Sequence, residues 1–157
     1  MSNNKHFPFK SEYPYLPFKL ITEAEVFNSI QNQNVIRVRA LWDTGAMLSA
    51  VTPEIAKKLN LVSINRIKIN GIGNYSIADI VRVSIRLPNM IELNNARISV
   101  LNLVKDVDML IGMDIIRLGD FSISNGAGKT LFTFAMPPFE QKTDLYEKAL
   151  EVNKRNI

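Results

Sequence analysis

Residues 40–52 read ALWDTGAMLSAVT and place one carboxylate, that of Asp43, inside an otherwise apolar run. An isolated ionised carboxylate is costly to bury unless it is paired or hydrogen-bonded. No Lys, Arg or His lies within this stretch to neutralise it. The partner of Asp43 must therefore come from elsewhere in the fold or from another chain.

The composition is that of one ordinary globular domain with few options for catalysis. The 157 residues are 46% hydrophobic and 22% charged, with a formal net charge of +4, values that suit a folded single domain. The basic residues are scattered, so we expect no nucleic acid as a partner. There is no Cys, and the single His is His6, which excludes disulfides, thiolate catalysis, Ser-His-Asp triads and His-rich metal sites.

The sequence shows no feature of export or membrane insertion. The first residues lack the apolar core of a signal peptide. No apolar run reaches the length of a transmembrane helix. We therefore expect no membrane partner and a cytoplasmic location.

Alternation of apolar and polar residues predicts a mainly β domain built from antiparallel hairpins. Such alternation with period two gives a strand one buried and one wet face, and turn-prone Asn94-Asn95 and Asn125-Gly126 separate some of the runs. The predicted strands cover residues 35–42, 66–70, 79–87, 96–104 and 130–136.

Helices are predicted at three places. Residues 52–59 combine Thr52 as N-cap with Pro53 in the first turn. Residues 114–119 form a short helix that stops at a Gly. Residues 144–155 carry an apolar stripe, and Asp144 caps their start.

Asp43-Thr44-Gly45-Ala46 follows a predicted strand, and this D-T-G-A sequence after two apolar residues resembles the active-site loop of retropepsin-like aspartic proteases. Two further segments match in the same order. Residues 70–74, NGIGN, are similar to the tip of the flap in retroviral proteases, and residues 107–116, VDMLIGMDII, resemble the family's apolar segment with Gly, any residue, then Asn or Asp before a short helix. Together these matches span about residues 35–118.

The resemblance implies a mainly β fold, namely a closed or partly open antiparallel β-barrel of the retropepsin (acid protease) type with short helices and an added C-terminal helix. We expect an extended N-terminal arm at residues 1–17, where Pro8, Pro14 and Pro17 stand among aromatic residues. We further expect a retropepsin-like domain at residues 18–136 and a C-terminal helical extension at residues 137–157.

The resemblance also implies an aspartic endopeptidase that acts on an extended peptide or protein substrate, with no metal or organic cofactor. That chemistry needs two carboxylates that share a proton and hold a water. Because the chain has a single D-T-G, Asp43 must meet Asp43 of a second copy in a homodimer.

Roles for the neighbouring residues follow from the same resemblance. The hydroxyl of Thr44 would bond across the two-fold axis, and Gly45 would let the substrate backbone approach. Met47 and Met113 stand where many retroviral enzymes pair an Asp with an Arg, so an apolar contact would replace an ion pair. The remaining expected site residues are Ala46 in the active-site loop, Gly71, Ile72 and Gly73 at the flap tip, and Gly112 and Asp114 as structural support, with Asp114 capping the short helix.

Two other functions fit the sequence. A non-catalytic dimer of the same fold would bind extended peptides in the same groove without cleaving them. A structural or assembly protein would hold partners through its N-terminal arm and C-terminal helix. Asp43-Thr44-Gly45 taken alone also fits a plain turn after a strand, because Asp and Gly are common turn residues.

The residue at position 46 generates a prediction about pH. Pepsin-like enzymes commonly carry Ser there, and a hydroxyl near the two carboxylates would stabilise their charged form. We expect Ala46→Ser to move the pH–rate profile of peptide cleavage toward more acidic pH. An unmoved profile would contradict this role of position 46.

Overall fold

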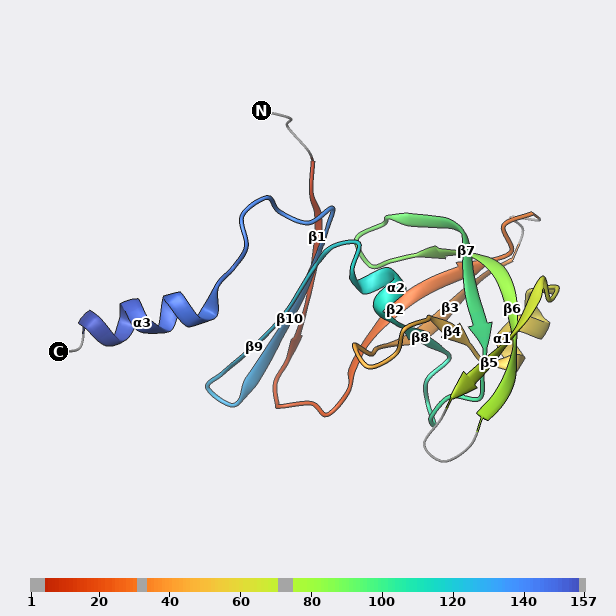
Figure 1. Ribbon diagram of the computed structural model, residues 1–157, viewed down its shortest axis with the longest axis horizontal. Coiled ribbons are helices and arrows are strands. Elements are labelled where there is room, and N and C mark those ends of the chain that lie inside the picture. The colour runs from red at the N-terminus through yellow and green to blue at the C-terminus, as the bar shows by residue number, and fades with distance from the viewer. Residues whose placement is uncertain (1–4, 31–33, 71–74, 156–157) are drawn as a thin grey trace.

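The computed structural model describes residues 5–30, 34–70 and 75–155 and arranges them in two sheets and three helices (Figure 1). The larger sheet has the order β2-β3-β8-β4-β7-β6-β5, and because β2 also pairs with β6 it closes into a ring. Its strands are β2 (Leu20–Phe27), β3 (Val35–Trp42), β4 (Ala50–Val51), β5 (Asn65–Asn70), β6 (Tyr75–Arg86), β7 (Glu92–Val100) and β8 (Met109–Ile111). The smaller sheet consists of β1 (Phe7–Tyr13), β10 (Lys129–Met136) and β9 (Asp120–Gly126), in this order.

The mainly β prediction is confirmed, and β3 shows why the alternation was informative. Val38 and Ala40 point into the core, whereas Arg37 and Arg39 are exposed. β6 differs from its predicted pattern at Ser84, which is buried rather than wet. Its hydroxyl donates to Asn94 Oδ1 over 3.1 Å, and this bond satisfies a buried polar group.

Three details of the sheets differ from the hairpin prediction. β3 pairs with β8, and β4 with β7, in parallel. The expected turn at Asn94-Asn95 lies inside β7, where two residues oppose Ser84 of β6 in a bulge and Asn95 has a φ of 56°. Likewise, Asn125-Gly126 ends β9, and the chain turns at Ala127 and Gly128, both with positive φ.

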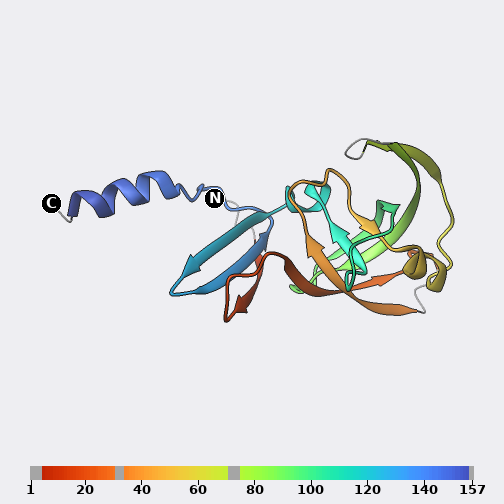
Figure 2. The ribbon, with the colours of Figure 1, turned by 90° about the horizontal axis from the view of Figure 1, so that it is seen from below.

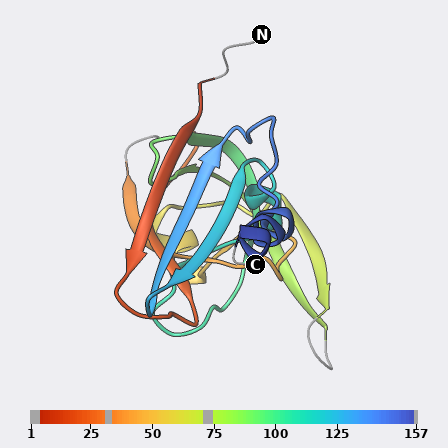
Figure 3. The same ribbon diagram turned by 90° about the vertical axis from the view of Figure 1, so that its left-hand side faces the viewer.

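The three-stranded sheet packs on the ring through aromatic side chains. β1, β10 and β9 lie side by side in Figure 3. Phe132 is fully buried, with its ring centroid 5.2 Å from that of Trp42, and Phe134 lies 4.9 Å from the same indole. The Trp42 indole N–H donates to the Thr22 hydroxyl over 2.9 Å. The residue just before Asp43 therefore anchors both sheets to one another.

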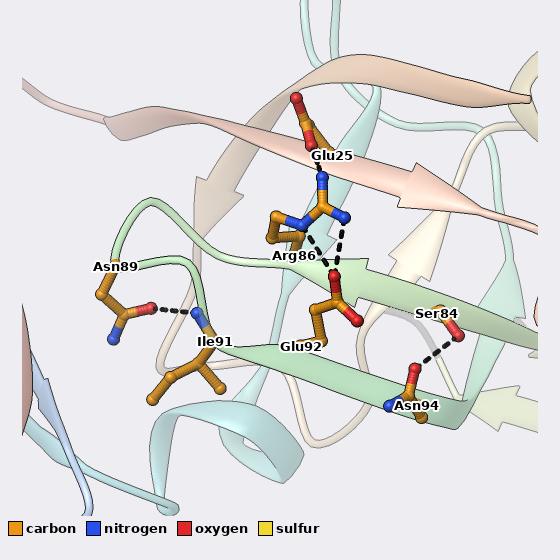
Figure 4. Close-up of polar contacts among 7 residues, drawn as sticks. All are labelled: Glu25, Ser84, Arg86, Asn89, Ile91, Glu92 and Asn94. Carbon is orange, nitrogen blue, oxygen red and sulfur yellow. Dashed lines mark hydrogen bonds and ion pairs between the residues drawn. The ribbon is translucent and has the colours of Figure 1, made fainter. Parts of the chain in front are cut away.

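A half-exposed guanidinium ties three strands of the ring together (Figure 4). Arg86 at the end of β6 donates to Glu25 of β2 and, from Nε over 2.9 Å and Nη2 over 2.6 Å, to Glu92 of β7. The β6–β7 turn that follows is closed by Asn89 Oδ1, which accepts from the Ile91 N–H. These contacts hold β2 against β6 where the ring closes.

The structure has a helix at each of the three predicted places, although the second ends at Ile116 rather than at the predicted Gly119. α1 (Pro53–Lys58) has Thr52 as its N-cap, α2 (Met113–Ile116) is a single short turn, and α3 (Leu145–Arg155) starts with Asp144 Oδ1 accepting from two backbone N–H groups. α3 extends away from both sheets, and all its residues are exposed (Figure 2). In the described part of the chain, no helix combines the length and hydropathy needed to cross a membrane.

We predict that Phe132→Ala lowers the free energy of unfolding by about 3–5 kcal/mol, because a fully buried ring that joins the two sheets is lost. Urea unfolding measures this loss. Leu131→Ala is the matched control, because this neighbouring side chain is 38% exposed and its loss should cost about 1 kcal/mol or less. Equal losses in the two variants would contradict the packing described here.

Candidate active site

Asp43 follows directly on β3 and begins a tight turn. Its N–H donates to the Ile111 carbonyl over 2.9 Å, which continues the parallel pairing of β3 with β8. Its Oδ1 accepts the Gly45 N–H over 2.8 Å, and the Ala46 N–H returns to its carbonyl over 3.3 Å. The half-buried carboxylate is thus oriented by the backbone of its own turn.

Gly112 allows the end of β8 to pass directly beneath this turn. A Cβ on Gly112 would lie 2.8 Å from the Leu48 carbonyl carbon and 2.9 Å from the Ala46 oxygen. The next N–H groups, those of Met113 and Asp114, donate to the carbonyls of Ala46 (2.8 Å) and Met47 (3.2 Å). The start of α2 therefore fixes the turn that carries Asp43 through two backbone hydrogen bonds, and we call this contact the clamp.

Asp114 supports the loop in a different way from the expected helix cap. The N-cap of α2 is Gly112, and no side chain caps this helix. Asp114 instead accepts from the Ser49 N–H, at 3.0 Å to each oxygen, and from the Ser49 hydroxyl, at 2.7 Å. The carboxylate reaches the far end of the loop that carries Asp43 and holds it there.

Ser49 is the supporting residue that the sequence analysis missed. It is fully buried, and its Oγ accepts the Gly112 N–H over 3.0 Å while donating to Asp114. Its carbonyl accepts both the N–H and the hydroxyl of Ser99 on β7. A Ser inside an apolar run was the available signal, because a buried hydroxyl needs partners.

Two hollows flank the loop. The hairpin-side hollow, of about 330 Å³, lies against the β5–β6 hairpin and is bordered by residues 45–48, Ile67, Lys68, Ile69, Ser99, Leu101 and Leu110. The sheet-side hollow, of about 510 Å³, lies toward the three-stranded sheet and contains Asp43 and Thr44 together with Phe18 and Ile123. The loop therefore presents different residues to each side.

The structure places the remaining expected residues as follows. Thr44 and Gly45 are exposed next to Asp43, and Ala46 is half-exposed. Gly71, Ile72 and Gly73 lie outside the described residues, although β5 and β6 pair up to Asn70 and Tyr75 on either side of them. Among residues 5–30, 34–70 and 75–155, the acidic and His side chains form no group of three that could hold a metal ion.

The arrangement offers one oriented carboxylate, which lines the sheet-side hollow. In the described residues no salt bridge involves Asp43, and no hydrogen bond to its Oδ2 is present. Such a group can accept a proton or bind a water. A single copy of the loop does not supply the second carboxylate that acid–base hydrolysis of a peptide requires.

A family model described as "Aspartyl protease" matches residues 28–115, more than half of the chain, including Asp43 and Asp114. No curated protein sequence matches the chain.

Solved structures of similar fold include a retropepsin-like aspartic protease from Rickettsia conorii, with a TM-score of 0.54, 18% identity and coverage of 87% of this chain and 98% of that one. The EIAV protease in complex with the inhibitor HBY-793 has a TM-score of 0.48 and 19% identity, over 65% of this chain and 88% of that one. The simian foamy virus (mac) protease has a TM-score of 0.43 and 17% identity, over 62% and 92%.

We predict that Gly112→Ala lowers the free energy of unfolding by about 1–3 kcal/mol, because the added methyl overlaps backbone atoms that have little room to move. Chemical denaturation measures the loss. Gly126→Ala serves as control, since a Cβ there meets no atom within 4 Å, and its stability should be unchanged or slightly raised. Full stability of Gly112→Ala would argue against the clamp.

Proposed function

The chain belongs to the aspartyl protease family, and from this premise we propose that it is an aspartic endopeptidase formed by two copies, with a water activated between Asp43 and the partner's Asp43. The observation that carries the proposal is the way the Asp43 carboxylate is oriented and what it faces. Its Oδ1 is held by the Gly45 N–H at 2.8 Å, and it faces a hollow rather than a cation of the described chain.

A second copy meets the requirement that one chain leaves open. In a two-fold assembly the same surface is used on both subunits, so one loop supplies both carboxylates. Two such groups about 3 Å apart share a single proton, because like charges at that distance do not both ionise easily. We expect the exposed Thr44 hydroxyl to bond to the partner's loop and hold the pair in register.

Peptide hydrolysis then proceeds by general acid–base catalysis. The ionised carboxylate takes a proton from the water as its oxygen attacks the scissile carbonyl carbon, and the proton on the other carboxyl passes to the carbonyl oxygen. The carboxyl that took the proton from the water then gives it to the nitrogen, and the carbon–nitrogen bond breaks. The other carboxylate takes a hydroxyl proton from the tetrahedral intermediate, so that the pair again holds one proton and the carboxylic acid and amine products are released. No step requires a metal or an organic cofactor.

The hairpin-side hollow supports an extended peptide as substrate. Its walls include the apolar side chains of Ile67 and Ile69 from β5 and Leu110 from β8, so we expect a preference for hydrophobic side chains near the scissile bond. β5 is the last strand in the order of the larger sheet, so we expect the peptide to add to its outer edge, and strand addition of this kind is a common mode of peptide recognition.

We predict that Asp43→Asn lowers kcat/KM for a hydrophobic test peptide by about 10²–10⁴-fold, because an amide does not act as the base. Peptide cleavage is followed by chromatography, and dimer formation by sedimentation. Asp106→Asn is the matched control, since this exposed carboxylate lies in the loop after β7 and should leave the rate unchanged. Peptide binding without cleavage by the unaltered protein would favour the non-catalytic dimer instead.

A further inference from the structure

Two arginines face each other across β6 and β7, which lie at the end of the molecule opposite α3 (Figure 1). Arg82 of β6 is directly opposite Arg97 of β7, and both residues are exposed. Residues that pair in this way have Cβ atoms about 4.5–5.5 Å apart, and like charges at such positions destabilise a sheet. The pair therefore costs stability unless an anion lies between the two guanidinium groups.

Every other arginine in the strands of the larger sheet faces a carboxylate instead. The register places Arg37 opposite Glu25, Arg39 opposite Glu23, Arg66 opposite Asp79 and Arg86 opposite Glu92. Opposite charges at these positions stabilise the strand pairs. The like-charged pair is thus an exception to the pattern that the rest of this sheet follows.

Neither Arg82 nor Arg97 has an acidic partner in the part of the chain that the structure describes. The salt bridges among residues 5–30, 34–70 and 75–155 do not include either of them. The residues outside these ranges include no Asp or Glu. An acidic side chain that neutralises the pair therefore has to come from another molecule.

The pair lies close to the hairpin-side hollow, in which we expect the peptide to bind. Ser99 lines this hollow, and Arg97 lies two residues before it on β7. Side chains two positions apart project from the same face of a strand, about 7 Å from one another. On β6, Arg82 has the same relation to Ile80, which pairs with Ser99. A peptide that extends from the hollow along this face reaches the two guanidinium groups within about two or three residues.

We propose that Arg82 and Arg97 together bind an acidic side chain of the peptide substrate, outside the hollow that receives its apolar side chains. The inference rests on the proposed function and adds a carboxylate to the hydrophobic substrate expected there. A carboxylate suits the pair because its two oxygens accept hydrogen bonds from planar guanidinium groups. Arg86 shows the inverse arrangement, one guanidinium between Glu25 and Glu92 (Figure 4).

A series of hydrophobic test peptides measures this preference. Each peptide carries one Glu at a position about two to six residues from the scissile bond, and its matched peptide carries Gln there. We expect kcat/KM at low ionic strength to be about three- to tenfold higher with Glu at one of these positions, because exposed ion pairs contribute modestly and are screened by salt. The Arg82→Gln/Arg97→Gln double variant should lower this ratio to about one.

Arg39→Gln is the matched control, since it removes one exposed arginine of a strand pair and leaves Arg82 and Arg97 in place. It should retain the full preference for Glu. A series in which no position prefers Glu, or in which the double variant keeps the preference, would overturn the inference and leave two solvated arginines only.

Reversal of the charges gives a test in the opposite direction. Arg82→Glu/Arg97→Glu should favour Lys over Gln at the position where the unaltered protein favours Glu, because specificity follows the sign of the charge. A preference that stays with Glu in this variant would rule out direct contact with the pair.

The repulsion between the two arginines can be tested without a peptide. Arg97→Glu gives Arg82 an opposite charge across the strand pair, so the urea midpoint of unfolding should rise. A midpoint that stays the same or falls would contradict the repulsion on which the inference rests.

These outcomes separate the carboxylate site from the proposed function. Peptide cleavage that depends on Asp43 but not on Glu refutes the site and leaves the protease in place. Selective binding of labelled Glu peptides over Gln peptides, followed by fluorescence anisotropy and lost in the double variant, supports the site even where no peptide is cleaved, and the absence of cleavage then refutes the protease.

Discussion

The close approach of β8 to the loop that carries Asp43 is the contact on which the site depends. Only a residue without a side chain fits at Gly112, between the start of α2 and the carbonyls of Ala46 and Leu48. Asp114 and the buried Ser49 hold the far end of the same loop. The carboxylate of Asp43 is therefore positioned by backbone and by buried hydrogen bonds of the folded chain.

The sequence was most informative where local rules decide the structure. The retropepsin-like, mainly β fold is confirmed, and β3, α1 and α3 follow from alternation and capping residues within each segment. The parallel pairings of β3 with β8 and β4 with β7 were not predicted, because residues far apart in the chain select them. The turn expected at Asn94-Asn95 is instead a bulge within β7. The buried Ser84 hydroxyl of β6 donates to Asn94 Oδ1 across it.

The residues of the candidate site were found in the sequence only in part, for the same reason. Asp43, Gly45 and Gly112 belong to short motifs whose chemistry is readable from residue type and order. Ser49 and Ser99 support the loop through partners that only the folded chain brings together. The exposure of Phe18 beside Asp43 is likewise a property of the tertiary structure, because the β1–β2 connection and the loop are distant in sequence.

The account's central claim is that two copies of Asp43 face each other across a two-fold axis. The most direct measurement is the distance between the two Asp43 carboxyl groups in a crystal structure of the assembled protein with a bound peptide inhibitor. The account predicts a separation of about 3 Å, close enough for one shared proton. Carboxyl groups held well apart, or a single copy binding the inhibitor alone, would contradict it.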